Sequence, residues 1–336
     1  MQRIINDPNF VVEDMLKGFS KCHSDIIHIS QRNPRVVVSN LNKNKKRVGI
    51  VTGGGSGHKP AFIGYCGKNI VDAVAVGEIF SSPTAKSFYD AICEVDQGMG
   101  VACLYGNYAG DNMNVKIAKE MAEDDDIVVK TVVANDDVAS APKDDLDKRR
   151  GVAGEILMWK VGGAKANLGG SLDEVIEISK RAIQNTRSVG VGLSPCTIPA
   201  NGKPNFKIEE GTIEFGIGHH GEPGVSVEPI SSAADMAKKM VDMVCSDLPF
   251  EKDDEVVVLV SGLGATPVME QYIYFNEVEK NLSDKGISIY KSYVGNYFTS
   301  LEMNGITLTL MKLDEDLKEC IDLEVDTMGL TQLGGN

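Results

Sequence analysis

Strand-like and helix-like runs alternate along the first half of the chain, and several of the strand-like runs end in glycine-rich turns. β-Branched and apolar residues predict strands over residues 47–52, 72–80, 100–107 and 127–135. Apolar residues at helical spacing predict helices between them, over residues 82–96 and 114–125. Such alternation is typical of a largely parallel sheet with helices packed on its faces.

A second group of strand-like runs follows a well-marked helix at residues 171–185. This helix begins with a capping box, in which Ser171 is the N-cap and Glu174 stands three residues later. Further strands are predicted over residues 188–196, 211–218, 255–262, 286–295 and 306–314, and further helices over 233–247 and 267–285. We therefore predict an α/β protein with mainly parallel or mixed sheets flanked by helices, divided into domains at 1–185 and 186–336.

Composition argues against several classes of protein and indicates a cellular compartment. No apolar run approaches the roughly 20 residues that a membrane-spanning helix needs, and the first ten residues lack the apolar centre of a secretory signal. The seven cysteines are scattered without a CxxC pair, which argues against a zinc ribbon and suits reduced thiols in a cytoplasm. The net charge of −14 disfavours direct binding to nucleic acid, because an acidic surface repels phosphates.

The glycine loop VTGGGSGHKP (51–60) follows a predicted strand, where parallel sheets commonly bind ligands. It does not match a nucleotide-binding phosphate loop, because Gly57 is followed by His58 and Lys59 rather than by Lys and then Ser or Thr. Bare glycines allow backbone N–H groups to approach a small ligand, and His58 could exchange a proton near neutral pH. The alternative is a tight turn that carries a surface histidine.

Acidic residues follow two other predicted strands. Asp111, in NYAGD, precedes a predicted helix, so it is either an N-cap or a general base directed into the same crevice. Asp136 and Asp137, in NDDVAS, could attract a divalent ion, but no other oxygen ligands cluster near them in the sequence, and we predict no metal site. The glycine-bearing segments at 261–266 and 295–305 are interpreted as simple turns.

Two adjacent histidines, His219 and His220, lie in the glycine-rich segment EFGIGHHGEPG (214–224). A metal site would need further ligands, and neighbouring side chains on a turn usually point apart. One interpretation is a solvated turn. The other is a nucleophile, because a neutral imidazole can add to a carbonyl carbon and bare glycines give a small carbonyl compound access to the ring nitrogen.

Nine segments spread over essentially the whole chain together resemble one family, the dihydroxyacetone-binding subunits of bacterial dihydroxyacetone kinases. HGEPG combined with GGGSGH and an NY-x-GD strand end forms no common motif elsewhere. The segments, in order, are GGGSGH (53–58), GEIFSSPT (77–84), NYAGD (107–111), NDDVA (135–139), KRRGVAG (148–154), NGKPNF (201–206), GIGHHGEPG (216–224), LGATP (263–267) and TSLEMNGITLTLMKLD (299–314).

The resemblance implies a homodimer that captures dihydroxyacetone covalently as a hemiaminal. The family's covalent histidine directly precedes GEPG, which places it at His220 and leaves His219 incidental. His58 is implied as a contact to the ligand hydroxyls and Asp111 as the general base. The backbone cradle is implied at Gly55, Ser56 and Gly57. The chain has no nucleotide loop, so we expect it to bind no cofactor; ATP or ADP and magnesium would belong to a partner subunit, which the phosphotransferase system recharges in many bacteria.

Three residues depart from the family pattern. Lys59 replaces the usual Glu after the loop histidine, Gly106 replaces a Lys that contacts substrate, and Ala109 replaces the Thr before GD. We expect all three beside the ligand site, and they slightly favour a dihydroxyacetone-sensing co-activator that works with a transcription factor. The alternative is a kinase subunit, whose substrate is dihydroxyacetone or another short ketose such as erythrulose. A silent binder without a regulatory partner is a third interpretation.

Overall fold

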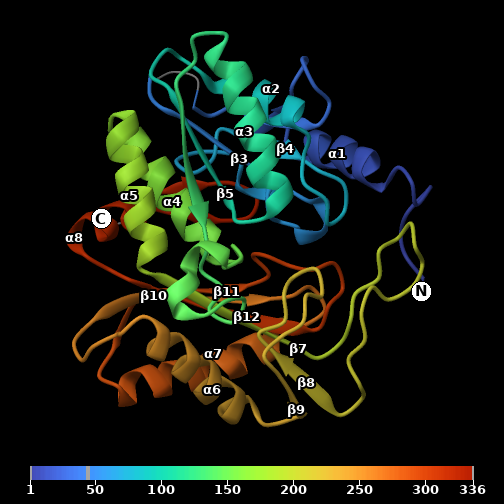
Figure 1. The fold of residues 1–336 in the computed structure, drawn as a ribbon, viewed down its shortest axis with the longest axis vertical. Helices are drawn as coiled ribbons and strands as arrows, with labels where there is room; N and C mark the ends of the chain where they lie inside the picture. The colour runs from blue at the N-terminus through green and yellow to red at the C-terminus, as the bar shows by residue number, and fades with distance from the viewer. Residues whose placement is uncertain (1, 43–45, 335–336) are drawn as a thin grey trace.

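The first sheet occupies the N-terminal half of the computed structural model, which describes residues 2–42 and 46–334 (Figure 1). Its strands lie in the order β1-β2-β4-β3-β5-β6, with β4, β3, β5 and β6 parallel and with β1 and β2 antiparallel at one edge. The strands are β1 (Ile27–Ile29), β2 (Val36–Ser39), β3 (Gly49–Gly54), β4 (Ala73–Val76), β5 (Val101–Gly106) and β6 (Val129–Ala134).

Helices cover both faces of this sheet because its strands are apolar on both sides. Val51 packs with α2 (Ala85–Val95) and α3 (Ala109–Glu123), whereas its neighbour Ile50 packs with the core around α4 (Gly154–Asn167) and α5 (Leu172–Gln184). Successive side chains of a strand point to opposite faces, so one strand supplies both cores.

The second sheet has the order β11-β10-β12-β7-β8-β9, in which only β10 and β11 pair in parallel. Helices α6 (Ala233–Asp247) and α7 (Val268–Asp284) cover one face, where Val256 and Val258 point. Val257 and Leu259 point the other way, toward the first half of the molecule. The strands are β7 (Thr186–Gly192), β8 (Thr212–Phe215), β9 (Ser226–Pro229), β10 (Glu255–Gly262), β11 (Ser288–Gly295) and β12 (Gly305–Lys312).

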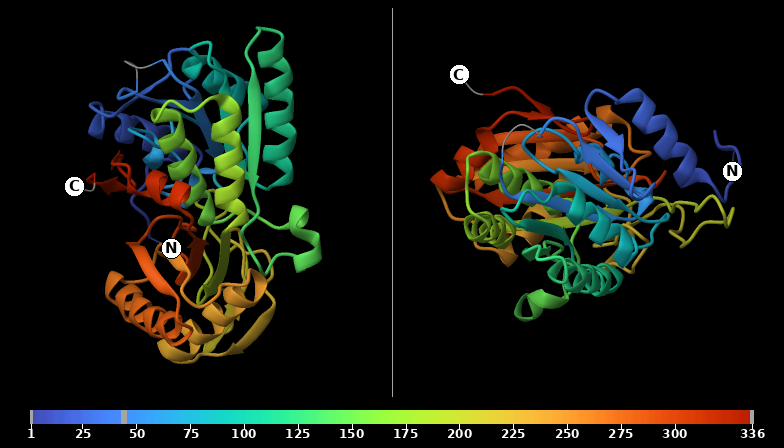
Figure 2. Two further views of the ribbon diagram at one scale, coloured as in Figure 1. Left: turned by 90° about the vertical axis from the view of Figure 1, so that its left-hand side faces the viewer. Right: turned by 90° about the horizontal axis from the view of Figure 1, so that it is seen from above.

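Helix α4 lies between the two halves and contacts strands of both sheets (Figures 1 and 2). All of its residues except Lys165 and Asn167 are buried, including the indole of Trp159. A helix enclosed on every side carries no polar stripe, so its sequence lacks the amphipathic period by which helices are recognised. For this reason no helix is predicted from the sequence over residues 154–167, where α4 lies.

The chain end returns to the first half. Helix α8 (Glu315–Asp322) packs beside α4, and its Leu317 and Ile321 join the core of the first half (Figure 2). The second sheet begins at Thr186, where we divided the chain, but this C-terminal segment packs with the preceding domain. The remaining elements are α1 (Val11–Cys22), the short helices η1 (Ser56–His58), η2 (Ile63–Tyr65) and η3 (Lys143–Lys148), and the ribbon β13 (Val325–Asp326) with β14 (Thr331–Gln332).

The predicted α/β class with mixed sheets flanked by helices is confirmed. The predicted capping box of α5 is also present, with the Ser171 hydroxyl accepting from the Glu174 N–H. Of the helices in the described residues, none combines the length and the apolar character needed to cross a membrane.

Candidate functional site

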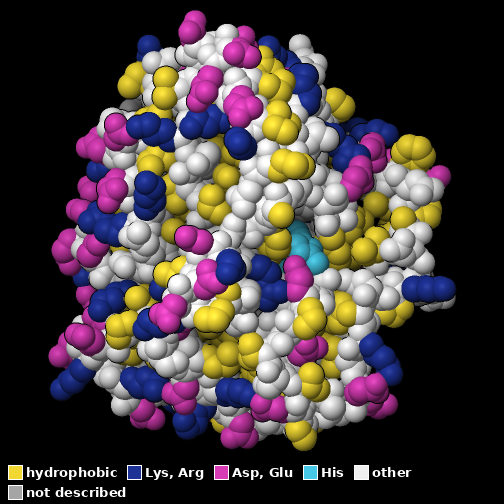
Figure 3. Space-filling view, in the orientation of Figure 1, with side chains coloured by type: hydrophobic (Ala, Val, Ile, Leu, Met, Phe, Trp, Pro, Cys, Tyr) yellow, Lys and Arg dark blue, Asp and Glu magenta, His cyan; other side chains and the backbone are white. Residues whose placement is uncertain are grey.

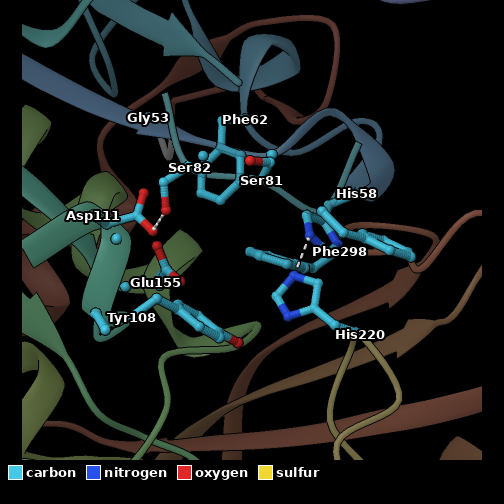
Figure 4. A pocket seen from close by; sticks show the side chains of 16 residues that line it. Gly53, His58, Phe62, Ser81, Ser82, Tyr108, Asp111, Glu155, His220 and Phe298 are labelled. Carbon is cyan, nitrogen blue, oxygen red and sulfur yellow. Dashed lines mark hydrogen bonds between the residues drawn. The ribbon is translucent and has the colours of Figure 1, made fainter. Parts of the chain in front are cut away.

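A pocket of about 250 Å³ lies where the two halves meet. Figure 3 shows histidine atoms reaching the surface in a hollow at this boundary, and Figure 4 shows the pocket from close by. This volume suits a small metabolite, since pockets for drug-sized ligands begin near about 300 Å³. The lining residues are Gly53, Gly54, Gly55, His58, Phe62, Phe80, Ser81, Ser82, Gly106, Tyr108, Ala109, Gly110, Asp111, Glu155, His220 and Phe298.

His58 ends η1, directly after β3, and its ring is buried. Its Nδ1 atom donates a hydrogen bond to the carbonyl oxygen of Thr299 at 2.7 Å. The N–H of Leu301 donates to the carbonyl oxygen of Gly57 at 2.8 Å. The segment after β11, which the sequence presents as a simple turn, therefore holds the glycine loop and orients His58.

His220 lies in the loop between β8 and β9, within a ring of aromatic side chains that includes Phe80 and Tyr108. The next residue, Gly221, has φ +85° and contacts Phe206 so closely that a Cβ atom would lie 2.1 Å from that ring, so only glycine fits there. The Nδ1 atom of His220 donates to the Glu222 carboxylate at 2.9 Å. Burial alone would raise the pKa of Glu222, but the hydrogen bond and charge of His220 lower it to about 2.

The rings of His58 and His220 meet end to end, with 3.0 Å between their Nε2 atoms (Figure 4). A carbonyl and a carboxylate can only accept, so both Nδ1 atoms carry hydrogens. The contact between the Nε2 atoms needs a third hydrogen, and the two rings together therefore carry one positive charge. Burial, followed by the charge of His220, holds the pKa of His58 well below its usual value.

His219 points away from its neighbour and into the core. Its ring stacks on Phe298 with centroids 4.8 Å apart, and its Nε2 atom lies 3.2 Å from the hydroxyl of Thr307. Burial, and next the charge of His220, lowers the pKa of His219 to about 3. His219 is a neutral core residue and does not line the pocket.

Asp111 lies in the first turn of α3, whose N-cap is Tyr108, so Asp111 is not the cap. The hydroxyl of Ser82 donates to its Oδ2 atom, whereas its buried Oδ1 atom has no hydrogen-bond partner in the part of the chain described. Burial raises the pKa of Asp111 to about 6, against the opposing effect of Ser82. The pocket thus holds a carboxyl group with a free oxygen that exchanges its proton close to neutral pH, as a general base requires.

The predicted backbone cradle reaches the pocket only in part. Gly55 lines the pocket. The backbone N–H of Ser56 instead donates to the carbonyl oxygen of Glu78 at 3.0 Å, and Ser56 does not line the pocket. Gly57 packs against the ring of Phe80, to which a Cβ atom would approach within 2.2 Å.

Asp136 and Asp137 are engaged within the fold. Asp136 accepts hydrogen bonds from the N–H groups of Val152 and Gly154, and Asp137 forms an ion pair with Arg150. Within residues 2–42 and 46–334, no three histidine, cysteine or acidic side chains cluster so as to hold a metal ion.

The departures from the family pattern do not all lie in the pocket. Gly106 and Ala109 line it, as expected. Lys59 does not, because its amine donates to the carbonyl oxygen of Ala61, and our expectation for this residue was wrong.

Two acids that we did not single out belong to the site, Glu222 beside His220 and Glu155 at the start of α4. Glu222 was visible as the carboxylate two residues after the nucleophile candidate. Glu155 was visible as the one acid in the largely apolar run GEILMWKVGGA (154–164), in which Lys160 is the other charged residue. Buried acids are rare without a role, so an acid in an apolar run is a usable signal.

Comparison with known proteins identifies the family of this chain. The Dak1 domain matches residues 17–329. A Listeria innocua protein, described as the dihydroxyacetone-binding subunit DhaK of PTS-dependent dihydroxyacetone kinase 1, is 43% identical over 98% of this chain and 99% of its own. A solved structure described as the dihydroxyacetone kinase operon co-activator Dha-DhaQ superposes with a TM-score of 0.87 at 32% identity, covering 94% of this chain and 97% of that one. The chain therefore belongs to the Dak1 family, which the sequence resemblance had indicated.

Proposed function

We propose that this chain binds dihydroxyacetone, or a closely related short ketose, as a covalent hemiaminal on His220. The observation that carries the proposal is the pairing of His220 with His58 and Glu222 at one end of a small pocket that has Asp111 at the other. The relatives described as dihydroxyacetone-binding subunits support the choice of ligand.

The pair of His220 and His58 can carry out each proton transfer that the addition to the ketone needs. The shared proton moves from His220 to His58, which frees the Nε2 lone pair of His220. That lone pair forms a bond to the ketone carbon while the carbonyl π electrons move to oxygen, and the oxygen takes the proton from His58. The product is an alkylated, positively charged imidazole ring, whose Nδ1–H remains hydrogen-bonded to the Glu222 carboxylate. Glycerol has no carbonyl group, so this bond separates ketones from polyols.

We place the role of kinase subunit first, because Asp111 has a free oxygen in the pocket and a near-neutral pKa. Asp111 would accept the proton of the ketose's terminal hydroxyl as that oxygen attacks a phosphoryl group. The nucleotide and magnesium would come from a separate subunit. A homodimer stays a prediction from the resemblance, and a cytoplasmic location stays a prediction from the scattered cysteines.

The second candidate is a co-activator that senses dihydroxyacetone and acts with a transcription factor. The missing side chain at Gly106, which lines the pocket, favours it, as does the likeness to the structure described as a co-activator. Such a protein would keep His220 and present its surface to a regulator.

One experiment separates the two roles. The chain is mixed with dihydroxyacetone and a charged nucleotide-binding subunit, and dihydroxyacetone phosphate is followed. We expect turnover at ordinary enzyme rates, about 1–100 per second. Covalent adduct without turnover would instead establish the sensor.

Replacing Glu222 with Gln should weaken adduct formation about tenfold, because the amide no longer offers a negative charge to the alkylated imidazole ring. The effect is moderate because the Glu222 side chain is 32% exposed. The equilibrium constant for the adduct, measured by native mass spectrometry against ketone concentration, checks this. An unchanged constant would mean that Glu222 only orients the ring.

A further inference from the structure

The carboxyl group of Glu155 is an unpartnered buried acid in the wall of the pocket. Glu155 is fully buried, at 0% exposure, and neither of its oxygens has a hydrogen-bond partner among the described residues. Figure 4 shows the group next to Asp111. The Oδ1 atom of Asp111 is likewise buried and has no partner within residues 2–42 and 46–334. Buried polar groups are rarely left unpaired, because an unpaired one destabilises the fold, so three free oxygens at one place indicate a ligand that satisfies them.

The two acids form a donor and an acceptor. No lysine or arginine is present among the described residues that line this pocket. Burial, and then the charges of Asp136 and Asp111, raises the pKa of Glu155 well above its usual value. Glu155 is therefore an uncharged acid that can donate a hydrogen bond, while Asp111, whose pKa is about 6, is the group that ionises near neutral pH.

Glu155 occupies the space that a side chain at position 106 would need. A Cβ atom on Gly106 would lie 2.2 Å from Oε1 of Glu155, and one on Gly151 would lie 2.9 Å from the same oxygen. These contacts leave no room for a side chain at position 106 while Glu155 keeps its place. The hydrogen-bond donor at this end of the pocket therefore comes from α4 and not from the end of β5.

We propose that Glu155 determines which ligands fit: its carboxylic acid donates a hydrogen bond to the terminal hydroxyl oxygen of the bound ketose, while Asp111 accepts that hydroxyl's hydrogen. This inference rests on the proposed function. A hydroxyl group has one donor and two lone pairs, which match one acceptor and one donor in the wall. A methyl end group would leave both acids unpaired, and a carboxylate end group would be repelled by Asp111.

The test uses two variants of Glu155 in the full chain. Glu155→Gln keeps a donor of similar shape, and Glu155→Met keeps the length without any polar group. We measure the dissociation constant for dihydroxyacetone by calorimetry and the melting temperature without ligand. We expect affinity to fall about tenfold in E155M and less than about threefold in E155Q. The melting temperature of E155M should equal or exceed that of the parent chain, because an unpaired buried group is removed.

Three outcomes in the variants would overturn the inference. Equal affinity in E155M and the parent chain would show that Glu155 does not touch the ligand. A lower melting temperature in E155M with unchanged affinity would assign Glu155 a structural role. Equal losses in E155Q and E155M would remove the claim that a donor at this position matters. If the parent chain itself failed to bind dihydroxyacetone, the proposed function would fail as well, whereas normal adduct formation with an insensitive Glu155 would sink this inference alone.

Discussion

His220→Ala should abolish the covalent adduct with dihydroxyacetone. The parent chain, equilibrated with the ketone, should gain the mass of one whole ketone, because hemiaminal formation releases no water. Alanine offers no lone pair to the carbonyl carbon, and we expect no replacement by His58, because its ring is buried and held in place by the hydrogen bond to Thr299. Native mass spectrometry at saturating ketone is the measurement, and the expected adduct in the variant is none.

The adjacent histidine provides the matched control. His219→Ala should keep the full adduct, because that ring lies in the core and not in the pocket. It should lower the melting temperature, because the stacking on Phe298 is lost. Adduct that persists in His220→Ala, or that disappears in His219→Ala while the protein stays folded, would show that we assigned the wrong imidazole.

Asp111→Asn should lower phosphoryl transfer to dihydroxyacetone by about 10²–10⁴-fold while the adduct still forms. The amide has nearly the shape of the carboxyl group but cannot take a proton from the attacking hydroxyl, and general-base catalysis is worth about that factor. The rate of dihydroxyacetone phosphate formation in the reconstituted system checks the first part, and native mass spectrometry checks the second. A rate within about threefold of the parent chain's would exclude Asp111 as the base.

The same residue predicts a pH profile. Burial raises the pKa of Asp111 to about 6, so the carboxylate form needed for catalysis is present above that pH and is lost as the pH falls through it. We expect kcat/KM to fall about tenfold per pH unit below that value. The profile is read as kcat/KM at limiting ketone, and a flat profile from pH 5 to 8 would contradict the assignment.

Local sequence patterns predicted most of the helices and strands. Strands β3 to β8 and β10 to β12 and helices α2, α3, α5, α6 and α7 each left a clear period or an apolar run in the sequence, and the capping box marked the start of α5. Strands β1, β2 and β9 and helices α1 and α8 were not predicted. Helix α4 left none, because burial between two sheets removes the polar stripe. The antiparallel pairing of most of the second sheet was equally hidden, since apolar runs do not state the direction of their neighbours.

The candidate site was recovered unevenly for a related reason. Distinctive glycine-rich motifs at strand ends contain His58, Asp111 and His220. The structure brings all three residues to one pocket. Ser56 and Gly57 belong to the same motif as His58, but Ser56 contacts Gly77 and Gly57 contacts the ring of Phe80. Adjacent residues of a motif lie on the same loop, but their side chains point in different directions. A motif therefore predicts the position of a loop better than it predicts which atoms of the loop face a ligand.

The sequence by itself determined the α/β class, the family and the chemical character of the pocket, because periodicity and short motifs are properties of neighbouring residues. Tertiary packing alone decided that His58 meets His220 across 162 positions of the chain with one proton between them. It also decided that Glu155 stands unpaired against Gly106, where its acid replaces a side chain. The physical reason is that a proton shared between two rings, or a carboxyl group without a partner, depends on which segments, distant in the sequence, pack against each other. A local sequence pattern does not determine that packing.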